Sequence, residues 1–73
     1  MQRTWRQVHR MTPDQERWAE ALAIKKTHGD KALSFVGVRI FELGQAGDIE
    51  GVKRWFEILT KLRDLRVAEE RPQ

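Results

Sequence analysis

Two histidines, His9 and His28, are the side chains of this 73-residue chain best suited to moving protons near neutral pH. Neither has a carboxylate at a spacing that would orient its ring for catalysis. A zinc site needs several histidine, cysteine or aspartate ligands at set spacings, and the chain has no cysteine. We therefore expect His28 to be a structural residue near a helix end, and we expect no metal site.

Paired carboxylates can perform acid–base catalysis, but the two pairs in this chain have simpler explanations. Asp48 and Glu50 lie at the start of a predicted helix, where acidic residues cap and stabilise the first turn. Glu69 and Glu70 lie in a predicted frayed tail, residues 69–73. Neither pair resembles a buried dyad with shifted pKa values.

The sequence also shows no activated hydroxyl nucleophile and no phosphate-binding loop. Thr27, Ser34 and Thr60 have no nearby base in the sequence to activate them. The glycines are scattered and carry no Gly-Lys-Ser/Thr ending, which a phosphate loop requires. The sequence therefore predicts a protein that is not an enzyme, with no catalytic residue, no cofactor and no identifiable small-molecule ligand.

The positive charge of the chain is concentrated at its N-terminus. The chain has 14 basic and 11 acidic residues, a formal net charge of +3. Arg3, Arg6 and Arg10 fall in the first ten residues, which hold no acid, so the remaining 11 basic residues equal the 11 acidic ones. Trp5 lies among these arginines and could stack on a base. Residues 1–11 are predicted to be a basic arm, and nucleic-acid binding through Arg3, Trp5, Arg6 and Arg10 is the alternative function.

The length of the chain predicts a single, marginally stable domain. A chain this short buries only about 60% of the surface that its unfolded form exposes. Without disulfides, close helix packing and self-association are the stabilisers that remain. No apolar run approaches the roughly 20 residues of a membrane span, and the N-terminus has no apolar signal core. The sequence predicts a soluble cytoplasmic protein that does not associate with membranes.

The start of the first helix is marked by Thr12, Pro13 and Gln15. Threonine followed three residues later by glutamine forms a capping box, and proline is favoured at the first helical position. The residues that follow are mostly strong helix formers. A helix is therefore predicted at about 13–28.

Two Gly-Asp pairs, Gly29-Asp30 and Gly47-Asp48, mark the junctions to the following helices. Glycine commonly ends a helix in the left-handed conformation, and aspartate caps the next one. Helices are therefore predicted at about 31–46 and 49–68, with very short connections. The fold class is all-α, a compact three-helix bundle over residues 12–68. A solenoid repeat is the weaker alternative, because the two junctions share little beyond the turn.

The helix predicted at 31–46 has two apolar stripes, and the helix at 49–68 has one. The first stripe of the middle helix is Leu33, Val36, Ile40 and Leu43; the second is Phe35, Val38 and Phe41. The stripe of the last helix is Ile49, Val52, Trp55 or Phe56, Leu59 and Leu62. The middle helix is therefore predicted to be central and contacted on two sides.

Two glycines and the second stripe suggest a partner for the middle helix. Gly37 and Gly44 lie about two turns apart, and glycine inside a helix costs about 0.5–1 kcal/mol relative to alanine, so we expect another backbone to come close. If the other helices leave Phe35, Val38 and Phe41 exposed, these residues form an interface with a second copy or another protein. An intramolecular core is the alternative. The predicted function is a small non-catalytic protein-interaction or assembly module.

Three segments of the chain carry a resemblance to a known family. They are MTPDQERWAEAL at 11–22, His28-Gly29-Asp30 with Ala32, and Ala46-Gly47-Asp48 with Gly51-Val52 and Trp55. The chain resembles a family of short uncharacterised alphaproteobacterial proteins, a domain of unknown function, over residues 11–65. Members of that family begin at the methionine that matches Met11, so residues 1–10 depart from the pattern as an extension or a different start. The resemblance implies a small helical fold in a bacterial cytoplasm and assigns no site residue.

Overall fold

The computed structural model describes residues 10–70, and every regular element in this range is helical. The elements are α2 (Pro13–His28), the 3-10 turn η1 (Gly29–Lys31), α3 (Ala32–Gln45) and α4 (Ile49–Glu70). The predicted all-α class is confirmed. The helices predicted at 13–28, 31–46 and 49–68 agree with the observed bounds to within two residues at each end. The difference at the C-terminus is that Glu69 and Glu70, which were predicted to fray, continue α4.

The N-terminus of α2 has the predicted capping box. The Thr12 hydroxyl oxygen accepts a hydrogen bond from the Gln15 backbone N–H at 3.1 Å. The Gln15 side-chain oxygen in turn accepts one from the Thr12 N–H at 2.9 Å. Pro13 opens the helix, where its missing N–H leaves no hydrogen bond unmade. The sequence pattern thus fixes where α2 begins.

The two Gly-Asp junctions have the same sequence but different structures. Gly29 and Gly47 both have positive φ, 55° and 76°, as predicted for helix terminators. Asp48 caps α4, and its Oδ1 accepts the Gly51 N–H at 2.9 Å. Asp30 does not cap α3, so that prediction was wrong. The 3-10 turn runs directly into α3, and the Ala32 N–H donates to the Gly29 carbonyl instead of to a side chain.

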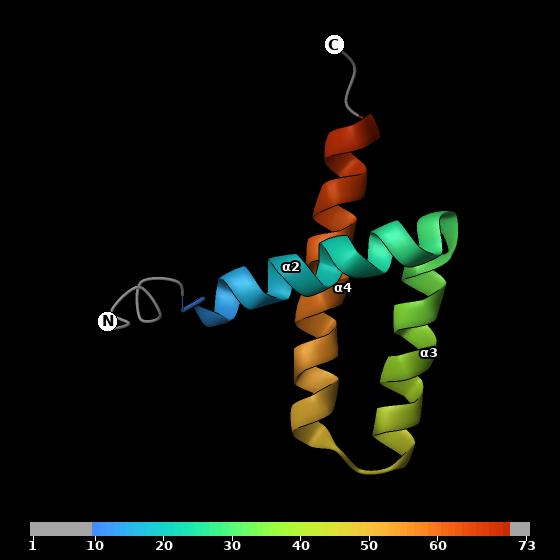
Figure 1. The fold of residues 1–73 in the computed structure, drawn as a ribbon. Coiled ribbons are helices and arrows are strands. Elements are labelled where there is room, and N and C mark those ends of the chain that lie inside the picture. Colours follow the sequence, from blue (N-terminus) through green and yellow to red (C-terminus); the bar gives the residue numbers. More distant parts are fainter. Residues whose placement is uncertain (1–9, 71–73) are drawn as a thin grey trace, which may run out of the picture.

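α3 and α4 form an antiparallel hairpin, and α2 crosses this hairpin steeply on one side (Figure 1). The molecule measures 45 × 43 × 17 Å, so its thickness is that of two stacked helical layers. Only one side of the α3–α4 hairpin is therefore covered by α2. No helix among residues 10–70 is long and apolar enough to cross a membrane.

The core lies where α2 crosses the hairpin, and it is small. Its five buried residues are Ala21 from α2, Ala32 and Val36 from α3, and Ile58 and Leu62 from α4. Two of these five are alanines, which let the backbones approach closely but bury little apolar surface. Half-buried side chains pack against this core from all three helices: Ile24 of α2, Leu33 and Ile40 of α3, and Trp55 and Leu59 of α4.

Candidate protein interface

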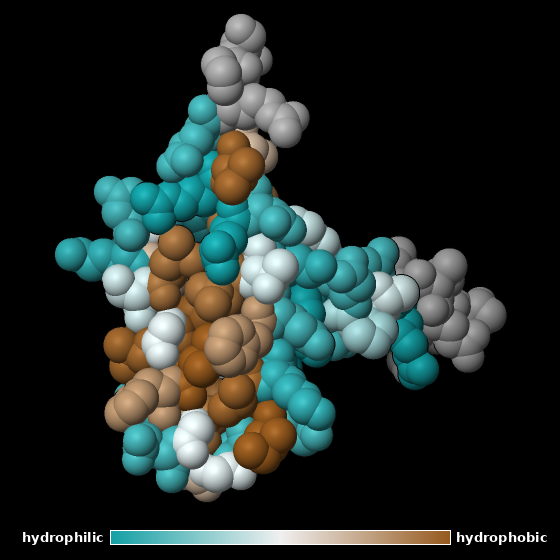
Figure 2. All heavy atoms as spheres, turned by 180° about the vertical axis from the view of Figure 1, so that it is seen from behind, coloured by the Kyte–Doolittle hydropathy of each residue, from teal (hydrophilic) through white to brown (hydrophobic). Residues whose placement is uncertain are grey.

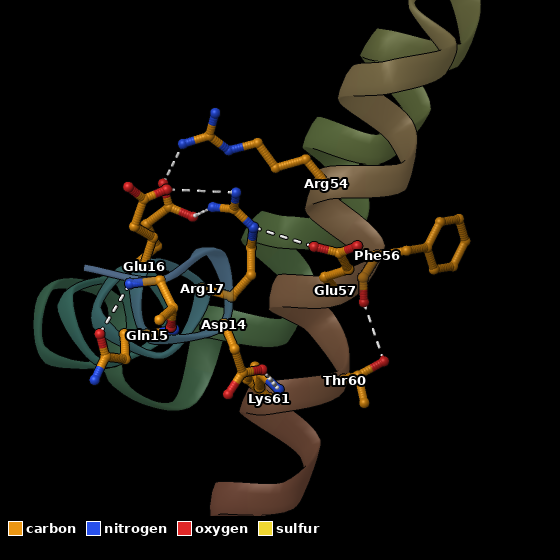
Figure 3. A network of polar contacts seen from close by, with 11 residues as sticks. Asp14, Gln15, Glu16, Arg17, Arg54, Phe56, Glu57, Thr60 and Lys61 are labelled. Carbon is orange, nitrogen blue, oxygen red and sulfur yellow. Dashed lines mark hydrogen bonds and ion pairs between the residues drawn. The ribbon is translucent and has the colours of Figure 1, made fainter. Parts of the chain in front are cut away.

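Ion pairs between α2 and α4 define which side of the hairpin α2 covers (Figure 3). Arg17 Nε donates to Glu57 Oε1 at 3.1 Å, and Lys61 Nζ donates to Asp14 Oδ1 at 2.7 Å. Arg54, which lies nearer the start of α4, donates to the carboxylate of Glu20 on α2. Residues 54, 57 and 61 of α4 therefore face α2.

Glu20 is the centre of this polar network. Its carboxylate accepts hydrogen bonds from Arg17 on its own helix and from Arg54 on α4. Burial acts to raise the pKa of Glu20, but the hydrogen bonds and positive charges of Arg54 and Arg17 outweigh burial and hold that pKa below its ordinary value. The same hydrogen bond acts in the opposite direction on its donor, and it raises the pKa of Arg17. The charged side chains of Arg17, Glu20 and Arg54 thus pair with one another across the contact between α2 and α4.

Helix geometry identifies the residues on the opposite side of α4. With about 100° of rotation per residue, Val52 and Phe56 lie about 100–180° around α4 from the three residues that pair with α2. Phe56 points away from α2 and its ion pairs (Figure 3). Its exposed fraction is 50%, and that of Ile49 is 62%. This side of α4 is thus apolar and uncovered.

Helix geometry also identifies the uncovered side of α3. Phe35 and Arg39 lie on the side of α3 that meets Trp55, and Phe35 also stacks on His28 at the end of α2. Gly37, Phe41 and Gly44 lie about 120–180° around the helix from those two residues. We call the uncovered side of the hairpin the hairpin face, and it consists of Gly37, Phe41, Gly44, Ile49, Val52 and Phe56.

The hairpin face is visible as one apolar area. Figure 2 views the molecule from the side opposite to Figure 1, and hydrophobic side chains gather there over α3 and α4. Polar side chains border this area above, below and on the right, and hydrophobic side chains reach the left edge of the molecule in the same view. A contiguous exposed apolar surface with a polar border is typical of a protein-interaction site.

The three predicted interface residues of α3 do not behave alike. Phe41 and Val38 are exposed, with exposed fractions of 66% and 57%. Phe35 is 38% exposed, because its ring stacks on His28 with a centroid distance of 4.0 Å and meets Trp55 edge-on at 6.1 Å. Phe41 belongs to the hairpin face, Val38 lies at its outer edge, and Phe35 joins an aromatic cluster within the chain.

The expected close approach of another backbone to Gly37 and Gly44 does not occur within the described chain. A Cβ added at either position would have nothing within 4 Å apart from the helix itself. The two glycines therefore leave a shallow strip on the hairpin face beside Phe41. Glycine weakens a helix, and within the described part of the molecule no close packing at Gly37 or Gly44 compensates for this loss of stability.

Sequence reasoning missed the contribution of α4 to this surface. The sequence pattern places Ile49 in the core stripe of the last helix and offers Trp55 or Phe56 for one position of that stripe. The structure half-buries Trp55 and exposes both Ile49 and Phe56. The seven-residue spacing from Ile49 to Phe56 was the available signal for a second stripe on this helix, parallel to the one predicted on α3.

The other candidate features of the described chain offer less chemistry. A hollow of about 540 Å³ lies between η1 and the last turns of α4, over Leu33 and Leu62. At the rim of the hollow, Lys25 and Glu69 form an ion pair with an N–O distance of 2.6 Å, and Arg66 and Glu70 form one at 3.2 Å. Among residues 10–70 no three histidine or acidic side chains converge as metal ligands.

The proposed nucleic-acid arm is largely outside the described residues. Arg3, Trp5 and Arg6 fall there, and Arg10 is exposed just before α2. On the described body, Arg54 faces Glu20, whereas Arg63 lies nine residues later and therefore about 180° around α4. These two arginines do not share a face with which the arm could form one basic surface, and the arm remains a prediction.

Comparisons with known proteins identify a family but not an activity. Neither the curated proteins nor the solved structures contain a significant match to the chain. One family model, described as "Family of unknown function (DUF6961)", matches residues 13–70, which span α2 to the last turn of α4. That match covers most of the 73 residues and all three α-helices. The chain belongs to this family of unknown function, DUF6961.

Proposed function

We propose that this protein is a small non-catalytic interaction module that binds a protein partner through the hairpin face. The observation that carries the proposal is the exposure of Phe41, Ile49 and Phe56 on one side of the hairpin, with exposed fractions of 66%, 62% and 50%. Removing a large apolar side chain from water contributes about 1.5–3 kcal/mol when burial is complete. Because these side chains are already partly buried, a partner that covers this face would gain about half to two-thirds of that free energy at each of three positions.

The small core supports the same proposal. Of the residues from 10 to 70 only five are buried, so this part of the chain hides little apolar surface between α2 and the hairpin. Domains of this size commonly rely on a partner to complete their packing. In this proposal, the closed bundle expected from the sequence is completed by helices that pack onto the hairpin face.

The polar residues of the body are consistent with a binding role. The described ion pairs join α2 to α4 or lie within one helix, and in the proposal they fix the position of α2 on the hairpin. A rigid apolar face loses little conformational entropy on binding. The absence of cysteine favours a reducing compartment, and we place the module in the cytoplasm.

The proposal is tested by photo-crosslinking in the cells that produce the protein. A photoreactive aromatic amino acid is placed at position 41, and the same amino acid at position 22 is the control. Leu22 is 51% exposed on α2, so both sites are accessible but only Phe41 lies on the hairpin face. We expect protein adducts from position 41 well above those from position 22. Equal labelling from the two positions would contradict the proposal.

A further inference from the structure

We infer that the partner at the hairpin face is a second copy of this chain, docked face to face about a twofold axis. The inference rests on the function proposed above and names its partner. In the arrangement we envisage, Phe41 of each copy lies over the Gly37–Gly44 strip of the other copy. The two α3–α4 hairpins then stack as two layers between the two copies of α2.

The first argument is that the hairpin face is self-complementary. A twofold interface requires each copy to present both halves of every contact, so that residue i meets j and j meets i. Phe41 projects from α3 with 66% of its surface exposed, and the glycines four residues before it and three residues after it leave space on the same side. One chain therefore carries both the projecting ring and the strip that can receive it.

The second argument is the charge of this face. The two charged residues of α3, Arg39 and Glu42, lie off the hairpin face and pair with each other at 3.3 Å. On α4, Lys53 lies one turn after Ile49 at the outer edge of the hairpin face and pairs with Glu50 at 3.8 Å, and Arg63 lies about two turns beyond Phe56. The centre of the face is therefore uncharged, and it meets its own copy without like-charge repulsion there, whereas a charged partner surface would lose water and gain no counter-charge.

The size of the hairpin face is also comparable with that of a small dimer interface. α3 is 14 residues long, which corresponds to about 21 Å, and two adjacent helices are about 20 Å wide. On α4 the exposed Val67 lies at nearly the same rotation as Phe56, one turn beyond Arg63, and adds an apolar side chain past the end of α3. The face thus spans on the order of 500 Å² per copy in projection, or about 1,000 Å² for two copies, which is the size at which specific interfaces begin.

The test is the mass of the purified full chain in solution, measured by sedimentation across the micromolar range. We expect the mass of two chains, and Phe41→Glu is expected to give the mass of one. Leu22→Glu introduces the same charge at a comparably exposed site on α2 and is expected to leave the dimer intact. A wild-type chain that sediments as one copy throughout, or a dimer that Phe41→Glu leaves unchanged, overturns the inference.

A second variant separates association from folding. In one chain, alanine at positions 37 and 44 meets no neighbouring side chain and replaces two helix-weakening glycines, so the isolated fold should become more stable. If Phe41 of a second copy fills the strip, the added methyl groups should weaken the dimer by about tenfold or more. A dimer of unchanged affinity in this double variant contradicts the docking we infer.

The crosslinking experiment distinguishes this inference from the broader function. If the purified chain is monomeric and position 41 crosslinks to a different protein, the second copy is ruled out and the interaction module stands. If the chain is monomeric and position 41 gives no more adducts than position 22, both are ruled out. Adducts between two copies, together with a dimeric mass, support both.

Discussion

At the residue scale, the two aspartates of the Gly-Asp junctions show that the same dipeptide can have different roles. Asp48 accepts the Gly51 N–H and caps α4, whereas Asp30 lies in a 3-10 turn and makes no capping bond. The sequence predicts both positive-φ glycines correctly but cannot distinguish the aspartates. Whether the chain continues through a 3-10 turn or stops and restarts depends on how the following helix must be oriented.

The difference between these aspartates gives a matched pair of variants. We expect Asp48→Ala to lower the free energy of unfolding by about 1 kcal/mol, because it removes a helix cap. Asp30→Ala removes the same side chain from the same sequence context and should change stability by less than about 0.5 kcal/mol. Urea unfolding followed by circular dichroism measures both. Equal losses would mean that Asp30 caps α3 after all.

Glu20 gives a prediction for the acid side of the stability profile. Its pKa in the folded chain lies below the ordinary value of 4.5, so its pairing with Arg17 and Arg54 stabilises the fold above pH 4.5. That contribution is lost as the pH falls from 4.5 through the lower folded-state value. We therefore expect Glu20→Gln to be less stable than the wild type at neutral pH and to lose less stability on acidification.

The comparison is made by thermal unfolding from neutral pH to pH 3. Asp64→Asn is the charge-matched control, because Asp64 is exposed on α4 and lies outside its first turn. This control should follow the acid dependence of the wild type. Parallel acid profiles for Glu20→Gln and the wild type would show that the network does not stabilise the fold.

At the scale of the elements, caps and periodicity predict all three helices, but they do not predict which face of each helix is covered. The second stripe of α3 was recognised from Phe35, Val38 and Phe41, yet Phe35 is held by His28 and Trp55 within the chain. The side that α2 covers is decided by partners more than 30 residues apart, such as Arg17 with Glu57 and Arg54 with Glu20. The spacing of neighbouring residues in the sequence does not predict such long-range pairs.

The docking of α2 onto the hairpin depends on the small side chain of Ala21. It is fully buried against the hairpin, and exposed ion pairs beside it contribute little on their own. We expect Ala21→Leu to destabilise the fold by about 1–3 kcal/mol, because the larger side chain forces the helices apart. Ala23→Leu makes the same change at an exposed position of α2 and should be nearly neutral. Similar unfolding midpoints for the two variants would mean that α2 does not pack closely here.

At the scale of the whole molecule, the basic arm and the folded body can be separated experimentally. The arm hypothesis predicts salt-sensitive binding to nucleic acid, because arginines that contact phosphates release counterions. Deleting residues 1–10 should abolish that binding while the self-association of the body persists, since the hairpin face lies wholly in α3 and α4. Fluorescence anisotropy at low and moderate salt, with mixed duplex and single-stranded probes, measures the first effect. Undiminished binding after the deletion would move the basic site into the body.

The thickness of 17 Å corresponds to α2 and the hairpin alone, so one side of the hairpin is uncovered in the described chain. If a second copy covers that side, folding and association are coupled, and stability must rise with protein concentration by mass action. We expect the wild-type melting temperature to rise by about 4–5 °C for each tenfold increase in concentration. Phe41→Glu should melt at one temperature across the same range, because its unfolding no longer includes dissociation. A wild-type melting temperature that does not depend on concentration would show that the single chain is the folding unit and that the hairpin face remains open to water.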